Sequence, residues 1–201
     1  MLIVGGTRGL GRAVVTAAHA AGHTLTVLAR NAAEFAAPVT GVRMVVGDAG
    51  DGDDVERAVA GQHAVVWTVS AGPGRTGAGV ASRGTVLVLA AMARHGVRRL
   101  VCVTCPGIPG GVRGRLAASL RARGGAEEAQ RQEAAVRASA ADWILVRPAA
   151  FRRGGPTGLY QALTAPAPGP LPRIARGDAA DFVVANLAAP DFVRQAVQLA
   201  G

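Results

Sequence analysis

A glycine-rich turn between an apolar run and a helical pattern constrains the fold of this chain more than any other feature. The apolar run is Met1–Val4, and the turn after it reads GGTRGLG, with Gly5, Gly9 and Gly11 in the spacing G-x-x-x-G-x-G. Apolar residues then recur at helical spacing until a further glycine, after which comes the β-branched run Thr24–Ala29. This order of strand, turn, helix and strand predicts a β-α-β unit with parallel strands.

The turn also predicts a phosphate-binding site. Glycines allow the backbone to turn sharply and to approach a pyrophosphate closely, and the helix N-terminus offers unpaired N–H groups to the phosphates. The spacing differs from the usual dinucleotide form G-x-G-x-x-G, but the flanking strands supply the setting that such a site requires. The alternative is a tight turn that binds nothing. The residues that we expect to contact a dinucleotide here are Gly5, Thr7, Arg8, Gly9, Leu10 and Gly11.

An arginine at the end of the second predicted strand favours NADP over NAD. An NAD site usually carries Asp or Glu about 20 residues beyond the glycines, where it accepts a hydrogen bond from the ribose 2′-hydroxyl. This chain has Arg30 there, and its next acidic residue is Glu34. A guanidinium can bind a 2′-phosphate through paired hydrogen bonds, with Arg8 and Arg12 as additional charges. The alternative is that Arg30 is only a solvated charge at the strand end.

Strand and helix patterns alternate along the rest of the chain. This alternation predicts one α/β domain over residues 1–201, a doubly wound (Rossmann) parallel sheet in the order 3-2-1-4-5-6. We expect the irregular segment 149–176 to form a loop or lid on the substrate side. The further predicted strands are Arg43–Val46, Ala64–Val69, Arg99–Thr104, Trp143–Val146 and Ala196–Leu199. The further predicted helices are Asp53–Ala60, Ala78–His95, an arginine-rich one ending near Ala138, and one capped by Asp178.

Charge and hydropathy narrow the range of partners. The formal net charge is +9, but all 22 basic residues are arginines spread along the chain, and aromatic residues make up only 3%. Scarce aromatics disfavour nucleic-acid binding by base stacking. The chain has no apolar run long enough to span a membrane, and no charged segment precedes the first strand, so we expect a soluble cytoplasmic protein. The sequence does not predict an oligomeric state.

The two cysteines form a C-x-x-C sequence, Cys102 to Cys105, which suggests a metal or redox pair. However, Cys102 lies in a predicted buried strand, where residues three apart point to opposite faces. No second Cys or His pair completes a zinc ligand set. We therefore expect no metal site, and we expect Cys102 to be a core residue. For Cys105, at the end of the strand, the pattern does not decide between a functional role and a packing role.

Several segments together resemble the atypical short-chain dehydrogenase/reductases, in particular the NmrA-like and biliverdin reductase B (NADPH-flavin reductase) group. The similarity covers nearly the whole chain and rests on GGTRGLG, VLARN, MVVGDAGD, VAGQHAVV, AAMARHGVRRLVCVT, SAADWILVRP and RIARGDAADFVVANL. The resemblance implies an NADP(H)-binding domain with Arg30 on the 2′-phosphate. It further implies Asp48 and Ala49 near the adenine, Ser70, Ala71 and Gly72 along the ribose and diphosphate, and Thr104 and Pro148 at the nicotinamide.

The residues that handle protons depart from this family. The Tyr-x-x-x-Lys pair of most of the superfamily cannot exist, because the chain has no lysine. Cys105 stands where the biliverdin reductase-like pattern has a serine, and two alanines follow Pro148 where that pattern has a histidine. The candidate catalytic residues are Cys105 and Tyr160, each with simple packing as the alternative. Glu133 could reach the cleft, but a solvated helix face is favoured.

These observations favour an NADPH-dependent reductase acting on a small conjugated or aromatic substrate, such as an enone, quinone or flavin-like compound. One alternative is an NADP-binding sensor without turnover, and another is a non-redox isomerase or cyclase on the same fold. Arginines near the expected pocket mouth could attract an anionic or carrier-bound substrate, with solvated surface charge as the alternative. These arginines are Arg113, Arg115, Arg121, Arg123, Arg152 and Arg153.

Overall fold

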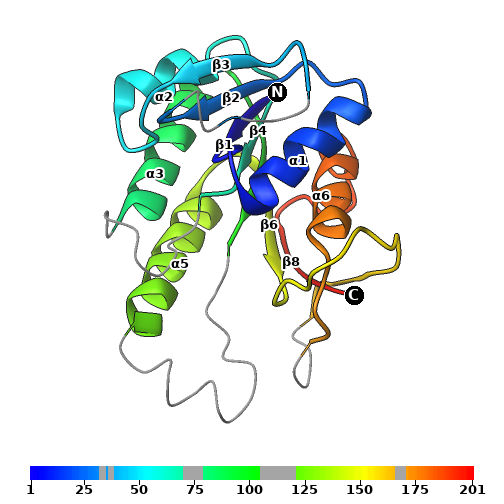
Figure 1. The fold of residues 1–201 in the computed structure, drawn as a ribbon. Helices are drawn as coiled ribbons and strands as arrows, with labels where there is room; N and C mark the ends of the chain where they lie inside the picture. The colour runs from blue at the N-terminus through cyan, green and yellow to red at the C-terminus, as the bar shows by residue number, and fades with distance from the viewer. Residues whose placement is uncertain (32–34, 36–38, 70–78, 105–120, 166–170) are drawn as a thin grey trace.

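The computed structural model describes residues 1–31, 35, 39–69, 79–104, 121–165 and 171–201. Within these residues, eight strands form one sheet, and helices cover both of its faces (Figure 1). The strands are β1 (Leu2–Val4), β2 (Thr26–Ala29), β3 (Arg43–Val46), β4 (Ala64–Trp67), β5 (Arg99–Val103), β6 (Asp142–Pro148), β7 (Gln161–Leu163) and β8 (Gln195–Ala200). The helices are α1 (Gly9–Ala20), α2 (Gly52–Val59), α3 (Val80–Arg94), α5 (Arg121–Ala138) and α6 (Arg176–Ala185).

The strand order is β3-β2-β1-β4-β5-β6-β8-β7, and every neighbouring pair is parallel except β7 with β8. The predicted order 3-2-1-4-5-6 is therefore confirmed, and β8 and β7 extend the sheet beyond β6. Because β1 to β6 and β8 all run the same way, their carboxyl ends lie at one edge of the sheet. Ligands of doubly wound sheets bind beyond this edge.

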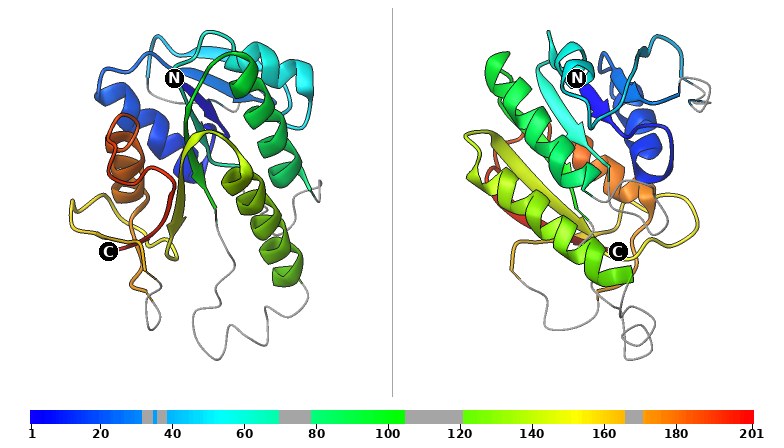
Figure 2. Two further views of the ribbon diagram at one scale, coloured as in Figure 1. Left: turned by 180° about the vertical axis from the view of Figure 1, so that it is seen from behind. Right: turned by 90° about the vertical axis from the view of Figure 1, so that its left-hand side faces the viewer.

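Two hydrophobic layers hold the helices against the sheet. Alternate strand residues such as Ile3 and Val66 pack with α1 and α6, whereas their neighbours Leu2 and Trp67 pack on the other face. Helices α2, α3 and α5 cover that second face, with α3 and α5 side by side (Figure 2). Cys102 belongs to this second layer and is fully buried, as predicted for a core residue. Burial raises the pKa of its thiol far above the usual value.

The described part of segment 149–176, residues 149–165 and 171–176, is more ordered than its composition suggests. It contains β7, which pairs antiparallel with β8 so that Gln161 lies opposite Ala200, and this corrects the expectation of an irregular segment. A strand of three residues is too short to show an alternation of apolar and polar residues in the sequence. It forms because the edge of β8 supplies its hydrogen-bonding partners. No helix in the described part of the chain is both long and apolar enough to cross a membrane.

The start of α6 also differs from the prediction. The helix is capped at Ala175 and begins at Arg176, so Asp178 lies inside its first turn and not at the N-cap. The carboxylate of Asp178 does not cap α6, because it accepts hydrogen bonds from the backbone N–H groups of Thr157 and Gly158 in segment 149–176.

Candidate functional site

The glycine turn brings three elements into close contact. A Cβ atom on Gly11, in the first turn of α1, would lie 2.2 Å from the carbonyl oxygen of Gly5 and 2.6 Å from Oγ1 of Thr68. Gly5 has a φ of +91°, and a Cβ there would lie 2.8 Å from the same hydroxyl oxygen. Thr68 follows β4 and donates its hydroxyl proton to the carbonyl of Val4 over 2.9 Å. Only glycine allows the turn, α1 and the end of β4 to approach this closely.

The N-terminus of α1 is open to an anion. Its N-cap residue Arg8 makes no side-chain capping bond, and the first turn contains no acidic residue. Apart from its chain neighbours and the backbone of α1, a Cβ on Gly9 would meet no atom of the described residues within 4 Å, so the space beside the first turn is open in this part of the structure. The side chain of Leu10 is buried in the core, which leaves its backbone for the site. Uncapped N–H groups and the helix dipole favour a phosphate group at this position. The turn thus fits the pyrophosphate that the sequence predicts.

We expect Gly11→Ala to destabilise the protein by about 1–3 kcal/mol, because the added methyl group forces α1 away from the turn. The same shift should weaken nucleotide binding. Gly52→Ala is the matched control, since a Cβ at Gly52 would have Leu87 Cδ2 as its nearest neighbour, at 3.8 Å. Urea denaturation of both variants measures the difference. Equal free energies of unfolding for the two variants would show that the close contact at Gly11 is unimportant.

The ends of β2 and β3 carry the residues predicted to bind the adenosine part of the cofactor. Arg30 follows β2 directly and is exposed, and its side chain forms no ion pair or hydrogen bond with the residues that the structure describes. Asp48 follows β3 and is also exposed, with its Oδ1 accepting a hydrogen bond from Gly50 N over 2.8 Å. Ala49 is half-buried, and its carbonyl oxygen lies against α3. Because β3, β2 and β1 are neighbours, these residues and the glycine turn share one edge of the sheet.

A buried ionic group lies at the ends of β5 and β6. Thr104, which follows β5 and is 0% exposed, donates its hydroxyl proton to Glu133 Oε1 over 2.8 Å. Arg147 of β6 donates from Nε to the same oxygen over 2.8 Å and from Nη2 to Oε2. Pro148 ends β6 directly after this arginine. The predicted nicotinamide end of the site is therefore positioned by an ion pair between α5 and β6.

The placement of Glu133 corrects the sequence-based interpretation. A solvated helix face was favoured, but Glu133 is only 8% exposed. Burial acts to raise its pKa, whereas hydrogen bonds from Arg147 and Thr104 and the charges of Arg147 and Arg137 hold the pKa below the usual value. Glu133 is therefore ionised at neutral pH. The signal in the sequence was its place in one stripe with the buried Ala129 and Val136.

Two further polar residues of α5 are buried against α3 and β5. Oε1 of Glu128 accepts a hydrogen bond from the backbone N–H of Ser82, in the first turn of α3, over 2.8 Å. Gln132 donates from Nε2 to Thr85 Oγ1 over 3.0 Å and lies 3.5 Å from Cys102 Sγ. These bonds fix the position of α5 on the sheet, and with it the position of Glu133.

The two predicted catalytic residues differ in what the structure describes. Tyr160 is half-buried, and its ring packs edge-on against Phe182 with 6.1 Å between ring centroids. Burial and the nearby Asp181 and Asp178 raise the pKa of its hydroxyl, so the hydroxyl is protonated at neutral pH. These contacts suit a packing role, and proton donation by Tyr160 stays a prediction. Cys105 lies outside the described residues, as do Ser70, Ala71 and Gly72 of the predicted cofactor site.

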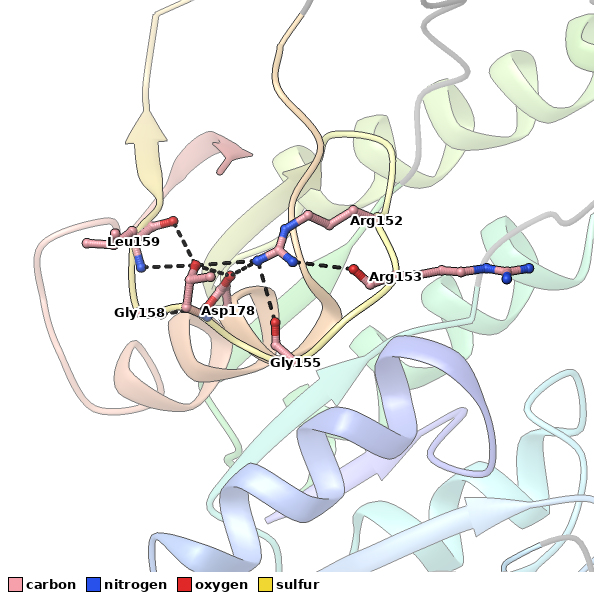
Figure 3. A network of polar contacts seen from close by, with 7 residues as sticks. Arg152, Arg153, Gly155, Gly158, Leu159 and Asp178 are labelled. Atoms are coloured by element: carbon pink, nitrogen blue, oxygen red, sulfur yellow. Dashed lines mark hydrogen bonds and ion pairs between the residues drawn. The ribbon is translucent and has the colours of Figure 1, made fainter.

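Asp178 organises the start of the predicted lid (Figure 3). Its Oδ1 accepts from the backbone N–H groups of Thr157 and Gly158 over 2.7 and 2.9 Å, and its Oδ2 accepts from the Thr157 hydroxyl over 3.0 Å. Nη2 of Arg152 lies 3.6 Å from Oδ2. The charge of Arg152 is thus partly balanced by Asp178, so it is less available to attract a substrate than the sequence predicted. The side chain of Arg153 extends away from the network (Figure 3).

The Asp178 network makes an acid-dependent contribution to stability. Burial acts to raise the pKa of Asp178, but the hydrogen bonds from Gly158 and Thr157 and the charge of Arg152 hold the pKa below its usual value. A folded-state pKa below the unfolded one stabilises the fold at higher pH, and this contribution is lost as the pH falls through the folded-state pKa. We expect wild type to be more stable than Asp178→Asn near neutral pH, with the difference shrinking below about pH 4.

Urea denaturation at several pH values measures this difference. Asp181→Asn is the control, because Asp181 is exposed on the same helix, and its replacement should change the free energy of unfolding by less than about 0.5 kcal/mol. An Asp178→Asn difference that does not change on acidification would contradict the assignment.

Comparison with known proteins agrees with this geometry. Residues 5–190 match the NAD(P)H-binding family. The chain is similar to ChuY, an anaerobillin reductase from Escherichia coli O157:H7, at 21% identity and a TM-score of 0.80, over 99% of this chain and 95% of that one. It is also similar to a short-chain dehydrogenase/reductase from Veillonella parvula solved in complex with NADP, at 14% identity and a TM-score of 0.82, over 100% and 93%.

A third similar structure is the oxidoreductase ylbE from Lactococcus lactis, at 16% identity and a TM-score of 0.82, over 100% of this chain and 91% of that one. At these identities the solved structures establish the fold, while the family match covers most of the chain. The glycine turn, the uncapped start of α1 and the sheet order all agree with that match. The chain belongs to the NAD(P)H-binding family and has the Rossmann fold of the atypical short-chain dehydrogenase/reductases.

Proposed function

We propose that this protein is an NADPH-dependent reductase of a small conjugated or aromatic substrate, such as an enone, quinone or flavin-like compound. The observation that carries the choice of NADPH is Arg30, an exposed guanidinium at the end of β2 without an ion-pair partner among the described residues. NAD sites usually place a carboxylate there, which would repel a 2′-phosphate. Two of the similar proteins support the proposal: one is an anaerobillin reductase, and another was solved with NADP.

In this proposal, each strand end has a distinct task. The turn from Gly5 to Gly11 holds the diphosphate through backbone N–H groups, and Arg30 binds the 2′-phosphate. Asp48 and Ala49 border the adenine, and Ser70, Ala71 and Gly72 follow the ribose and diphosphate. Thr104 and Pro148 border the nicotinamide. When bound, the cofactor supplies a hydride, and the protein orients it against the substrate.

The groups at the ends of β5 and β6 favour a substrate that needs no strong acid from the protein. Thr104 directs its hydroxyl proton to the ionised Glu133, so its oxygen offers lone pairs and not a proton to a neighbour. Glu133 and Arg147 form an ion pair with two hydrogen bonds, so neither is placed as a proton donor to the substrate. A quinone or flavin can take its proton from water. An enone would need a donor, for which Tyr160 and Cys105 are the predicted candidates.

Steady-state oxidation of NADPH and NADH with a panel of quinones, flavin mononucleotide and enones tests the function. We expect turnover of at least one substrate with NADPH and slower turnover with NADH. Arg30→Glu should lose the preference for NADPH. Tight NADP⁺ binding without oxidation of NADPH by any panel member would contradict a reductase and favour a cofactor-binding sensor or a non-redox enzyme.

A further inference from the structure

A polar pocket lies on the sheet face that α5 covers, and its lining comes from α5, β6, β8 and the residue after β7. Its volume is about 270 Å³. The pocket is partly open to solvent, and its volume exceeds the ~10–15 Å³ that a single water molecule requires. The pocket is lined by Arg137, Arg147, Thr164, Gln195, Ala196 and Gln198.

The two arginines of this pocket share a single carboxylate. Glu133 accepts two hydrogen bonds from Arg147, and its Oε2 lies 3.9 Å from Nη2 of Arg137. None of the residues that line the pocket is acidic. Two guanidinium groups therefore face one negative charge, and one positive charge beside the pocket is left without a counter-ion among these residues.

Both guanidinium groups have N–H donors that make no hydrogen bond with the described residues. The bonds of Arg147 to Glu133 use Nε and Nη2, and its Nη1 makes no hydrogen bond with the described residues. Arg137 makes no hydrogen bond with the described residues either, and its guanidinium carbon lies 5.3 Å from the centre of the Trp143 ring. The ring and Glu133 hold the two groups in place without using these donors. Fixed guanidinium groups with free donors bind oxyanions at little entropic cost.

We propose that this pocket is a binding site for the carboxylate of a small organic acid. The guanidinium groups of Arg137 and Arg147 would bind the carboxylate through charge-assisted hydrogen bonds. The hydroxyl of Thr164 also lines the pocket and can bond another polar atom of the ligand. The site is separate from the glycine turn and Arg30, so the proposal stands or falls independently of the proposed reductase function.

The pocket is one side chain away from the predicted nicotinamide end of the cleft. Arg147 lines the pocket and also holds Glu133, which accepts the hydroxyl proton of Thr104. A carboxylate bound at Nη1 of Arg147 would share this guanidinium with Glu133, which is bound at Nε and Nη2. An acid bound in the pocket would therefore be connected to Thr104, at the end of β5, through Arg147 and Glu133.

Calorimetric titration with succinate at constant ionic strength tests the site, with the uncharged dimethyl ester as the control ligand. We expect saturable binding of one succinate per chain and no binding of the ester. Arg137→Gln should weaken succinate binding about tenfold or more, because a hydrogen bond to a charged group is lost. Thr164→Val, at an exposed position, should weaken it several-fold without affecting folding.

Two control variants separate this site from general attraction to a cationic protein. Arg131→Gln removes the same charge from the exposed face of α5 and should leave the succinate affinity unchanged. Arg30→Glu should also leave it unchanged, since that residue belongs to the predicted nucleotide site. The proposal is overturned if wild type shows no saturable binding, if Arg137→Gln binds as tightly as wild type, or if Arg30→Glu abolishes binding.

Discussion

Replacing Arg30 with glutamate is expected to weaken NADPH binding by at least about tenfold. The variant loses hydrogen bonds between charged groups worth ~1.5–3 kcal/mol, and its carboxylate repels the 2′-phosphate. NADH lacks this phosphate, so its affinity should change little or improve as the new carboxylate accepts from the ribose 2′-hydroxyl. Calorimetric titration of both cofactors into wild type and the variant measures this exchange of preference.

Arg43→Glu is the matched control, because it makes the same change of charge at an exposed position. Arg43 begins β3 and therefore lies at the amino edge of the sheet, opposite to the predicted site. We expect Arg43→Glu to leave the affinity for NADPH close to that of wild type. If Arg30→Glu binds NADPH as tightly as this control does, Arg30 does not contact the 2′-phosphate.

The second large effect is expected at Glu133. Glu133→Ala should lower the free energy of unfolding by about 3 kcal/mol, at the lower end of the range for breaking a buried ion pair, since Arg147 is 28% exposed. The change leaves Arg147 without its carboxylate and the buried hydroxyl of Thr104 without its acceptor. Urea denaturation near neutral pH, where Glu133 is ionised, measures the loss.

Glu127→Ala provides the control on the same helix. Glu127 is 65% exposed and pairs with Arg131 over 3.3 Å, and an exposed pair of this kind contributes only about 0–1 kcal/mol. A similar small loss for Glu133→Ala would mean that the ionic group at the ends of β5 and β6 does not stabilise the fold.

The sequence was sufficient to predict the part of the fold that holds the site. Strands β1, β2 and β4 are short and buried on both faces, and their apolar runs are visible in the sequence. The predicted Arg43–Val46 agrees with β3, and the other predicted strands agree with the structure within a few residues. Glycine is required at Gly11 by its contact with Gly5, which is local in the chain, and at both glycines by Thr68, which follows β4, the strand next to β1. A local requirement of this kind leaves a pattern that can be read without knowledge of the tertiary structure.

The features that the sequence did not reveal depend on distant partners. Glu133 is buried only because Arg147 and Thr104 satisfy its carboxylate, and the stripe that it shares with Ala129 and Val136 does not reveal these partners. Asp178 looks like a helix cap, but its partners Thr157 and Gly158 lie in a different segment. Strand β7 is too short to show alternation, and it is stabilised by pairing with β8. In each case the energy comes from a contact between segments, which the local pattern does not record.

Calorimetric titration of the wild-type protein with NADP⁺, and in parallel with NAD⁺, tests the central claim most directly. If the glycine turn and Arg30 together bind a phosphorylated adenine nucleotide, one NADP⁺ should bind per chain, about tenfold or more tightly than NAD⁺. Equal affinity for the two cofactors, or no heat with either of them, would contradict the account.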